Sequence, residues 1–136
     1  MLVLAGLLAA SIAAPPQRAQ TPCLRYEPDT VRISGKLTRH TFYGPPGFGE
    51  DPEHDAKEAG FYLESPVALC TLASADNEAK SRVTLVQLVL DSAGYARLRP
   101  RLGTSVTLRG TLFAAITGHH HAPILLRVAK PLRVEP

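Results

Sequence analysis

The spacing of apolar residues predicts five β-strands. Residues 31–42 and 106–116 alternate between apolar and polar positions, which is the period-two pattern of a half-buried strand. Residues 61–69, 83–90 and 124–128 are further apolar segments, and 83–90 is nearly continuous, as expected of a strand with little solvent exposure. In the two alternating strands, the positions expected to face the core are Val31, Ile33, Leu37, Val106, Leu108, Leu112 and Ile116.

One short helix is expected between the third and fourth strands. Asp91 or Ser92 can cap a helix that runs through Leu98, and Pro100 then stops it. Gly35 and Gly110 lie at equivalent places in the first and fourth strands and favour sharp local coiling. The order strand, strand, strand, helix, strand, strand is that of an OB-type barrel. We therefore predict an all-β fold with one short helix, a small OB-like five-stranded barrel; an open β-sandwich is the alternative.

The N-terminal residues indicate export. Residues 1–14 form an uncharged apolar run that ends in small residues, as a secretory signal peptide does, although the usual positive start is missing. A transmembrane anchor is less favoured, because Pro15 and Pro16 end the run before the roughly 20 apolar residues that a span needs. Residues 15–22 are interpreted as a linker, and residues 23–136 as one OB-like domain in a periplasmic or secreted protein.

Export changes the interpretation of the two cysteines. An oxidising compartment favours a disulfide, and Cys23 and Cys70 are the only candidates. We expect a structural bridge that holds the N-terminal segment against the barrel. A reactive or metal-binding thiol is the alternative.

Composition and charge fit one ordinary domain with an uneven charge distribution. At 136 residues, 45% hydrophobic and 20% charged, the chain has the composition of one globular unit. Residues 50–58 carry five acids and one base, whereas residues 92–134 carry seven bases and no acid. These surfaces could attract charged partners, pair with each other, or serve only solubility.

Several segments together resemble one known family. They are CLRYEP at 23–28, RHTFYGPPGF at 39–48, the Pro66 and Cys70 pair, VQLVL at 86–90 and GTLFAAITGHHHAPILL at 110–126. The chain resembles an uncharacterised bacterial family, domain of unknown function 4431, whose members are typically exported. The resemblance implies export and one small domain, and it implies no catalytic residues. Phe61 and Tyr62 stand where other members often have Trp, and Ala114 and Ala115 replace a longer residue.

Three consecutive histidines are the main candidates for chemistry. If the register of the last strand continues backwards, His119 and His121 share one face and His120 the other. Two histidines at i and i+2 can bind one metal ion through neutral imidazole, and His54 with nearby carboxylates could complete the site. Zinc or copper would suit such ligands. Hydrogen bonding to loop backbone, direct ligand contact and pH sensing are the alternatives.

The loop at 44–58 offers a second candidate surface. Phe42, Tyr43 and Phe48 could stack on a sugar or peptide, or simply close the end of the barrel. The carboxylates of the loop could in principle serve in hydrolysis, but nothing in the sequence fixes their separation.

We therefore expect a small exported domain that binds a ligand or protein of the cell envelope. The candidate ligand-contacting residues are Phe42, Tyr43, Phe48, His119 and His121. The alternative is a metal-binding protein that uses His119, His120, His121 and His54. We expect no catalysis, because the sequence has no nucleophile motif and no phosphate-binding loop. Nucleic acid is not expected as a partner of an exported chain.

Overall fold

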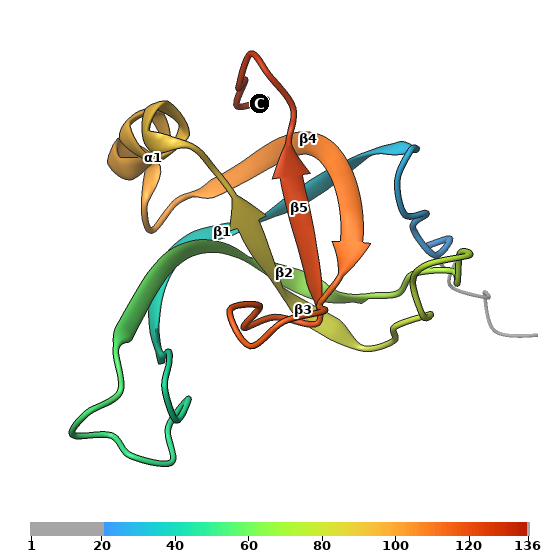
Figure 1. Cartoon of the computed structure of the whole chain (residues 1–136). Helices are drawn as coiled ribbons and strands as arrows, with labels where there is room; N and C mark the ends of the chain where they lie inside the picture. Colours follow the sequence, from blue (N-terminus) through green and yellow to red (C-terminus); the bar gives the residue numbers. More distant parts are fainter. Residues whose placement is uncertain (1–20, 136) are drawn as a thin grey trace, which may run out of the picture.

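A computed structural model describes residues 21–135, and its five strands form one closed sheet (Figure 1). The predicted signal peptide and residues 15–20 of the predicted linker lie outside the described residues. The elements are β1 (Thr30–Tyr43), β2 (Lys57–Leu69), β3 (Val83–Val89), α1 (Ser92–Leu98), the 3-10 turn η1 (Arg99–Arg101), β4 (Ser105–Ala114) and β5 (Ile124–Val128). Their order around the barrel is β1-β2-β3-β5-β4.

The long strand β1 belongs to both halves of the barrel. Its first half pairs antiparallel with β4, from Thr30 to Lys36, and its second half pairs antiparallel with β2, from Lys36 to Tyr43. The parallel pair β3–β5 completes the ring. This strand order, with a helix between β3 and β4, is that of an OB-type barrel, so the predicted fold is confirmed.

The core consists of the inward side chains of the alternating strands. The fully buried apolar residues inside the barrel include Ile33, Leu37, Leu63, Val86, Leu108, Leu112, Ile124 and Leu126. Gly110 is required where β4 meets β5, because a Cβ there would lie 2.1 Å from the carbonyl oxygen of Arg127. The repeated glycine of the two long strands therefore permits close backbone approach.

Two predicted strand boundaries were wrong. The second strand begins at Lys57 rather than at Phe61, because residues 57–60 continue the hairpin with β1 beyond the apolar core and lack an alternating apolar pattern. The fourth strand ends at Ala114, and Ile116 is 74% exposed instead of facing the core. The alternation that includes Ile116 continues into a loop that is no longer part of the sheet.

The helix is capped as expected. The carboxylate of Asp91 accepts a hydrogen bond from the backbone N–H of Gly94 at 2.8 Å and is also 2.6 Å from Lys130 Nζ. The Lys130 ammonium and the Gly94 N–H hold the pKa of Asp91 below its usual range. Leu98 turns inward and is fully buried, so α1 covers one end of the barrel.

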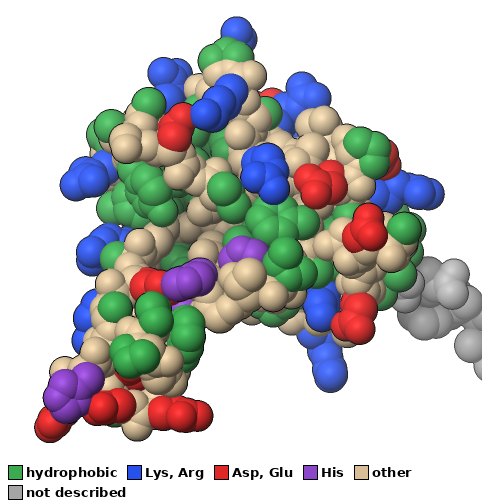
Figure 2. Space-filling model, viewed as in Figure 1, with side chains coloured by type: hydrophobic (Ala, Val, Ile, Leu, Met, Phe, Trp, Pro, Cys, Tyr) green, Lys and Arg blue, Asp and Glu red, His purple; other side chains and the backbone are tan. Residues whose placement is uncertain are grey.

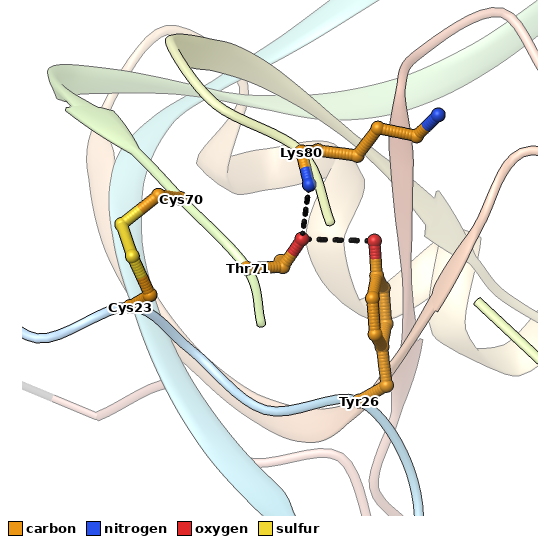
Figure 3. The surroundings of a disulfide bond; sticks show 5 residues. All are labelled: Cys23, Tyr26, Cys70, Thr71 and Lys80. Carbon is orange, nitrogen blue, oxygen red and sulfur yellow. Dashed lines mark hydrogen bonds between the residues drawn. A yellow bond between two sulfur atoms is a disulfide. The ribbon is translucent and has the colours of Figure 1, made fainter. Parts of the chain in front are cut away.

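The predicted disulfide is confirmed. Cys23 and Cys70 are bonded across a sequence separation of 47 residues (Figure 3). Beside them, buried Tyr26 donates a hydrogen bond to the carbonyl of Glu78 at 2.8 Å and accepts one from Thr71 at 2.9 Å. The N-terminal segment is therefore held both covalently and by hydrogen bonds. Among residues 21–135, no helix is long and apolar enough to cross a membrane.

Candidate functional site

The candidate site lies where two loops meet at one end of the barrel. Strands β1 and β2 extend beyond the core as a projecting hairpin whose turn is residues 44–56 (Figure 1). Residues 115–123 connect β4 to β5 and pack against this hairpin through the contacts described below. We call these two loops together the hairpin-end surface.

Glu58, near the start of β2, joins the two loops. One carboxylate oxygen lies 2.5 Å from Nδ1 of His119, and the other lies 2.7 Å from Nε2 of His121. The two histidines are two residues apart, so both rings reach the same carboxylate. The hydrogen bond from His121, the larger contribution, and that from His119 hold the pKa of Glu58 below its usual range despite partial burial.

Aromatic packing fixes the positions of both histidine rings. Phe42 is the direct cross-strand partner of Glu58, and its ring stacks on His121 with centroids 4.7 Å apart and planes 6° from parallel. Phe48 meets His119 edge to face at 5.7 Å. Phe48 also lies so close to Gly118 that a Cβ at that glycine would be 2.8 Å from the ring. Glycine at 118 therefore allows the two loops to touch.

Gln87 of β3 holds the backbone of the same loop. Its side-chain oxygen accepts a hydrogen bond from the N–H of His121 at 2.7 Å, and its side-chain nitrogen donates to the carbonyl of His119 at 3.2 Å. Glu58 thus holds the side chains of the two histidines, while Gln87 holds their main chain.

Tyr62 lies on the same outer face of the sheet. It is the cross-strand partner of Gln87 and is 1% exposed, although it is outside the barrel core cluster. Phe42 and His40 pack on its ring at 5.6 and 5.2 Å. Burial, with smaller contributions from Tyr95 and Glu58, raises the pKa of Tyr62 to about 12, so the phenol remains neutral.

The four histidines predicted as metal ligands do not converge. His120 points away from Glu58: its Nδ1 accepts a hydrogen bond from the N–H of Ile116, and its ring packs on Phe113. Burial and the neighbouring histidines lower the pKa of His120. His54 is bonded to Asp51 in the exposed turn of the hairpin. Within residues 21–135, no group of three or more His, Cys, Asp or Glu side chains is placed to hold a metal ion.

The loop at 44–56 is ordered by a carboxylate that does not reach the histidines. Asp55 is buried and accepts backbone hydrogen bonds from Gly47 and Gly49, both at 2.6 Å, and from Asp51 at 3.2 Å. Burial alone would raise the pKa of Asp55, but these three N–H groups outweigh it and lower the pKa. The sequence suggested that acids of this loop approach the histidines; the acid that does so is Glu58.

The predicted contact residues are therefore mostly together. Phe42, Phe48, His119 and His121 form one contiguous cluster with Glu58. Tyr43, on the opposite side of β1 from Phe42, lies under the Lys57 ammonium at 3.3 Å and is separate from that cluster. Gln87 was missed, and the signal that could have found it is a lone amide inside the apolar run 83–90.

Exposed groups of two kinds occupy the hairpin-end surface. Phe48 is 45% exposed and Ile116 is 74% exposed. Acidic side chains gather at the projecting end of the hairpin, and both acidic and basic side chains are spread over the rest of the visible face (Figure 2). The exposed acids of the turn are Glu50, Asp51 and Glu53. Exposed apolar side chains and exposed acids thus occur on the same two loops, a composition that suits a docking surface.

Fold and site together define a small OB-like β-barrel domain that is stapled by a disulfide and carries a histidine–carboxylate cluster at its loop end. Residues 85–132 match the model of an uncharacterised family described as Domain of unknown function (DUF4431), which confirms the resemblance to that family for this part of the chain. The matched segment runs from within β3 to just beyond β5 and includes the triple histidine. No curated protein and no solved structure matches the chain.

Proposed function

We propose that this chain is an exported binding domain that uses the hairpin-end surface to contact a protein of the cell envelope. The observation that carries the proposal is the rigid support of an exposed apolar surface. Phe48 and Ile116 remain exposed on loops that Glu58, Gln87 and Asp55 hold in place. A preorganised loop surface loses little conformational entropy when a partner binds.

The position of this surface in the fold also supports a binding role. In OB-type barrels, the face of the second and third strands and the loops after the first and fourth strands bind ligands. The hairpin-end surface consists of the same two loops, and Glu58 and Gln87 lie on the same two strands. This support is an analogy of fold. The exposed acids of the hairpin turn favour a partner that carries positive charge.

The Glu58 carboxylate supports the proposed binding surface. Both oxygens of Glu58 are engaged by histidines, and Phe42 covers one face of the His121 ring. A carboxylate whose two oxygens both accept hydrogen bonds from ring nitrogens is engaged as a support of the loop that carries those rings.

Export is part of the same proposal. The disulfide supports it, because disulfides persist mainly in oxidising compartments. The apolar segment at residues 1–14 supports it from the sequence. A fusion of residues 1–20 to a reporter that is active only outside the cytoplasm tests it: an inactive reporter contradicts export.

Site-specific photo-crosslinking tests the binding role. A photoreactive amino acid is placed at Phe48 or at Ile116 in cells that make the protein naturally, and adducts are identified after irradiation. We expect discrete adducts with one protein from both positions. The control position is Leu72, which is also 45% exposed but lies beside the disulfide. The same adducts from Leu72, or none from the two loop positions, would contradict the proposal.

A further inference from the structure

The end of the barrel that carries α1 lies opposite the hairpin-end surface (Figure 1). There, α1 and the segment after β5 flank an open cavity of about 340 Å³. One wall is the helix, with Ala93, Gly94 and Arg97, and the other consists of the ends of β3 and β5 with Leu132. This volume is at the lower end of the range of small-molecule pockets.

The lining of this cavity is mainly aliphatic. Val89, Leu90, Val128 and Leu132 contribute the apolar walls, and the Asp91–Lys130 ion pair links the helix to the C-terminal segment at 2.6 Å. An aliphatic chain that enters would leave water for these walls, at about 0.8 kcal/mol per buried methylene. All lining residues fall within the segment that matches the family model.

The charged side chains of the pocket indicate which polar group a ligand would carry. Asp91 and Lys130 neutralise each other, whereas Arg97 is exposed and, in the described part of the chain, forms no ion pair with a carboxylate. Lys130 and Arg97 are the basic residues of the lining, and only Lys130 is paired with an acid of that lining. A guanidinium binds a carboxylate through two parallel hydrogen bonds.

We infer that this cavity binds a small aliphatic carboxylate, with the hydrocarbon chain between α1 and the end of β5 and the carboxylate at Arg97. The site uses none of the residues of the hairpin-end surface. Its occupancy is therefore independent of the proposed protein contact, and either proposal can fail alone.

The test is a titration of the disulfide-bonded domain with octanoate below its micelle concentration. Binding is followed by calorimetry and by the amide resonances of α1. We expect saturable one-to-one binding with Kd of about 0.1–1 mM. Acetate lacks the apolar chain and octan-1-ol lacks the charge, and each is expected to bind at least about tenfold more weakly than octanoate.

Matched variants locate the site. Ala93→Leu fills the cavity and is expected to weaken octanoate at least about tenfold. Ala96→Leu adds the same side chain at another exposed position of α1 that does not line the cavity, and should have no effect. Arg97→Gln should weaken binding about 3–5-fold, and Arg99→Gln, also outside the lining, should not. The inference would be overturned if octanoate binding did not saturate or if acetate bound as tightly as octanoate. Equal effects of the two leucine variants on octanoate binding would also overturn it.

Discussion

At the scale of single residues, Glu58 decides how the triple-histidine loop is held. Its carboxylate accepts from two rings, so Glu58→Gln removes the charge and lets only one of the two hydrogen bonds keep its present direction. We expect the free energy of opening residues 115–123 to fall by about 1–2 kcal/mol while the barrel stays folded. Amide hydrogen exchange at His121, whose N–H is bonded to Gln87, measures this change.

The control for this variant is Glu64→Gln. Glu64 lies on the same face of β2 and bonds a different histidine, His40, at 3.0 Å. The Glu64→Gln variant should leave amide hydrogen exchange at His121 unchanged. If the two variants accelerated exchange equally, the effect would be one of general charge and not of the Glu58 contacts.

The same residue predicts a pH dependence. The pKa of Glu58 is lowered in the folded protein by His121 and His119, so its stabilising contribution is present above the ordinary glutamate pKa of about 4.3 and is lost as the pH falls through the lower folded value. Protonated Glu58 closely resembles glutamine. The difference in loop opening between the natural protein and Glu58→Gln should therefore be full at pH 5 and shrink toward pH 3. A difference that stays constant down to pH 3 would refute this linkage.

At the scale of elements, the close antiparallel pairing of β4 with β5 depends on Gly110. A Cβ there would lie 2.1 Å from backbone, which cannot rotate away as a side chain does. Gly110→Ala should therefore lower the free energy of unfolding by about 1–3 kcal/mol, as overpacking does, when measured by urea denaturation. Gly60→Ala is the matched control, because its Cβ would meet the ring of Tyr62 at 3.2 Å, which a shift of a few tenths of an ångström relieves. If both variants lost the same free energy of unfolding, the loss would come from the reduced backbone flexibility of alanine relative to glycine and not from the close contact at Gly110.

At the scale of the whole molecule, the barrel could be predicted from local patterns because one face of each long strand is buried. Alternation located β1 and β4, and the position of the helix then determined the topology. The projecting part of the hairpin could not be predicted in this way, since residues 57–60 are outside the core and their pairing leaves no apolar period.

The candidate site was only partly predictable for a related reason. The alternation of side chains along a strand correctly placed His119 and His121 on the same side. Which acid contacts them, Glu58 or Asp55, depends on which carboxylate accepts hydrogen bonds from the backbone of the turn. That capture involves three N–H groups of a folded loop. Charge counting along the sequence treats the acids of residues 50–58 as equivalent and cannot separate them.

The attachment of the N-terminal segment to the barrel gives the last prediction. The disulfide closes a loop across 47 residues, and the chain-entropy model assigns such a loop about 4 kcal/mol, usually more than is measured. Replacing both cysteines by serine should lower the free energy of unfolding by about 2–4 kcal/mol. The barrel should still fold, because Tyr26 ties the same segment to Thr71 (Figure 3) and to the carbonyl of Glu78.

These two attachments should be coupled. With the disulfide intact, Tyr26→Phe removes the hydrogen bonds of a hydroxyl whose neighbours stay in place. Without the disulfide, the same change leaves the segment held only by the backbone hydrogen bonds of Leu24 and Glu27, so it can loosen. Urea denaturation of the natural protein, the double-serine variant, Tyr26→Phe and their combination forms a double-mutant cycle. We expect the combined loss to exceed the sum of the separate losses by at least about 0.5 kcal/mol. Strict additivity would mean that the disulfide and the tyrosine stabilise the segment independently, and complete unfolding of the double-serine variant would mean that the hydrogen bonds alone cannot hold it.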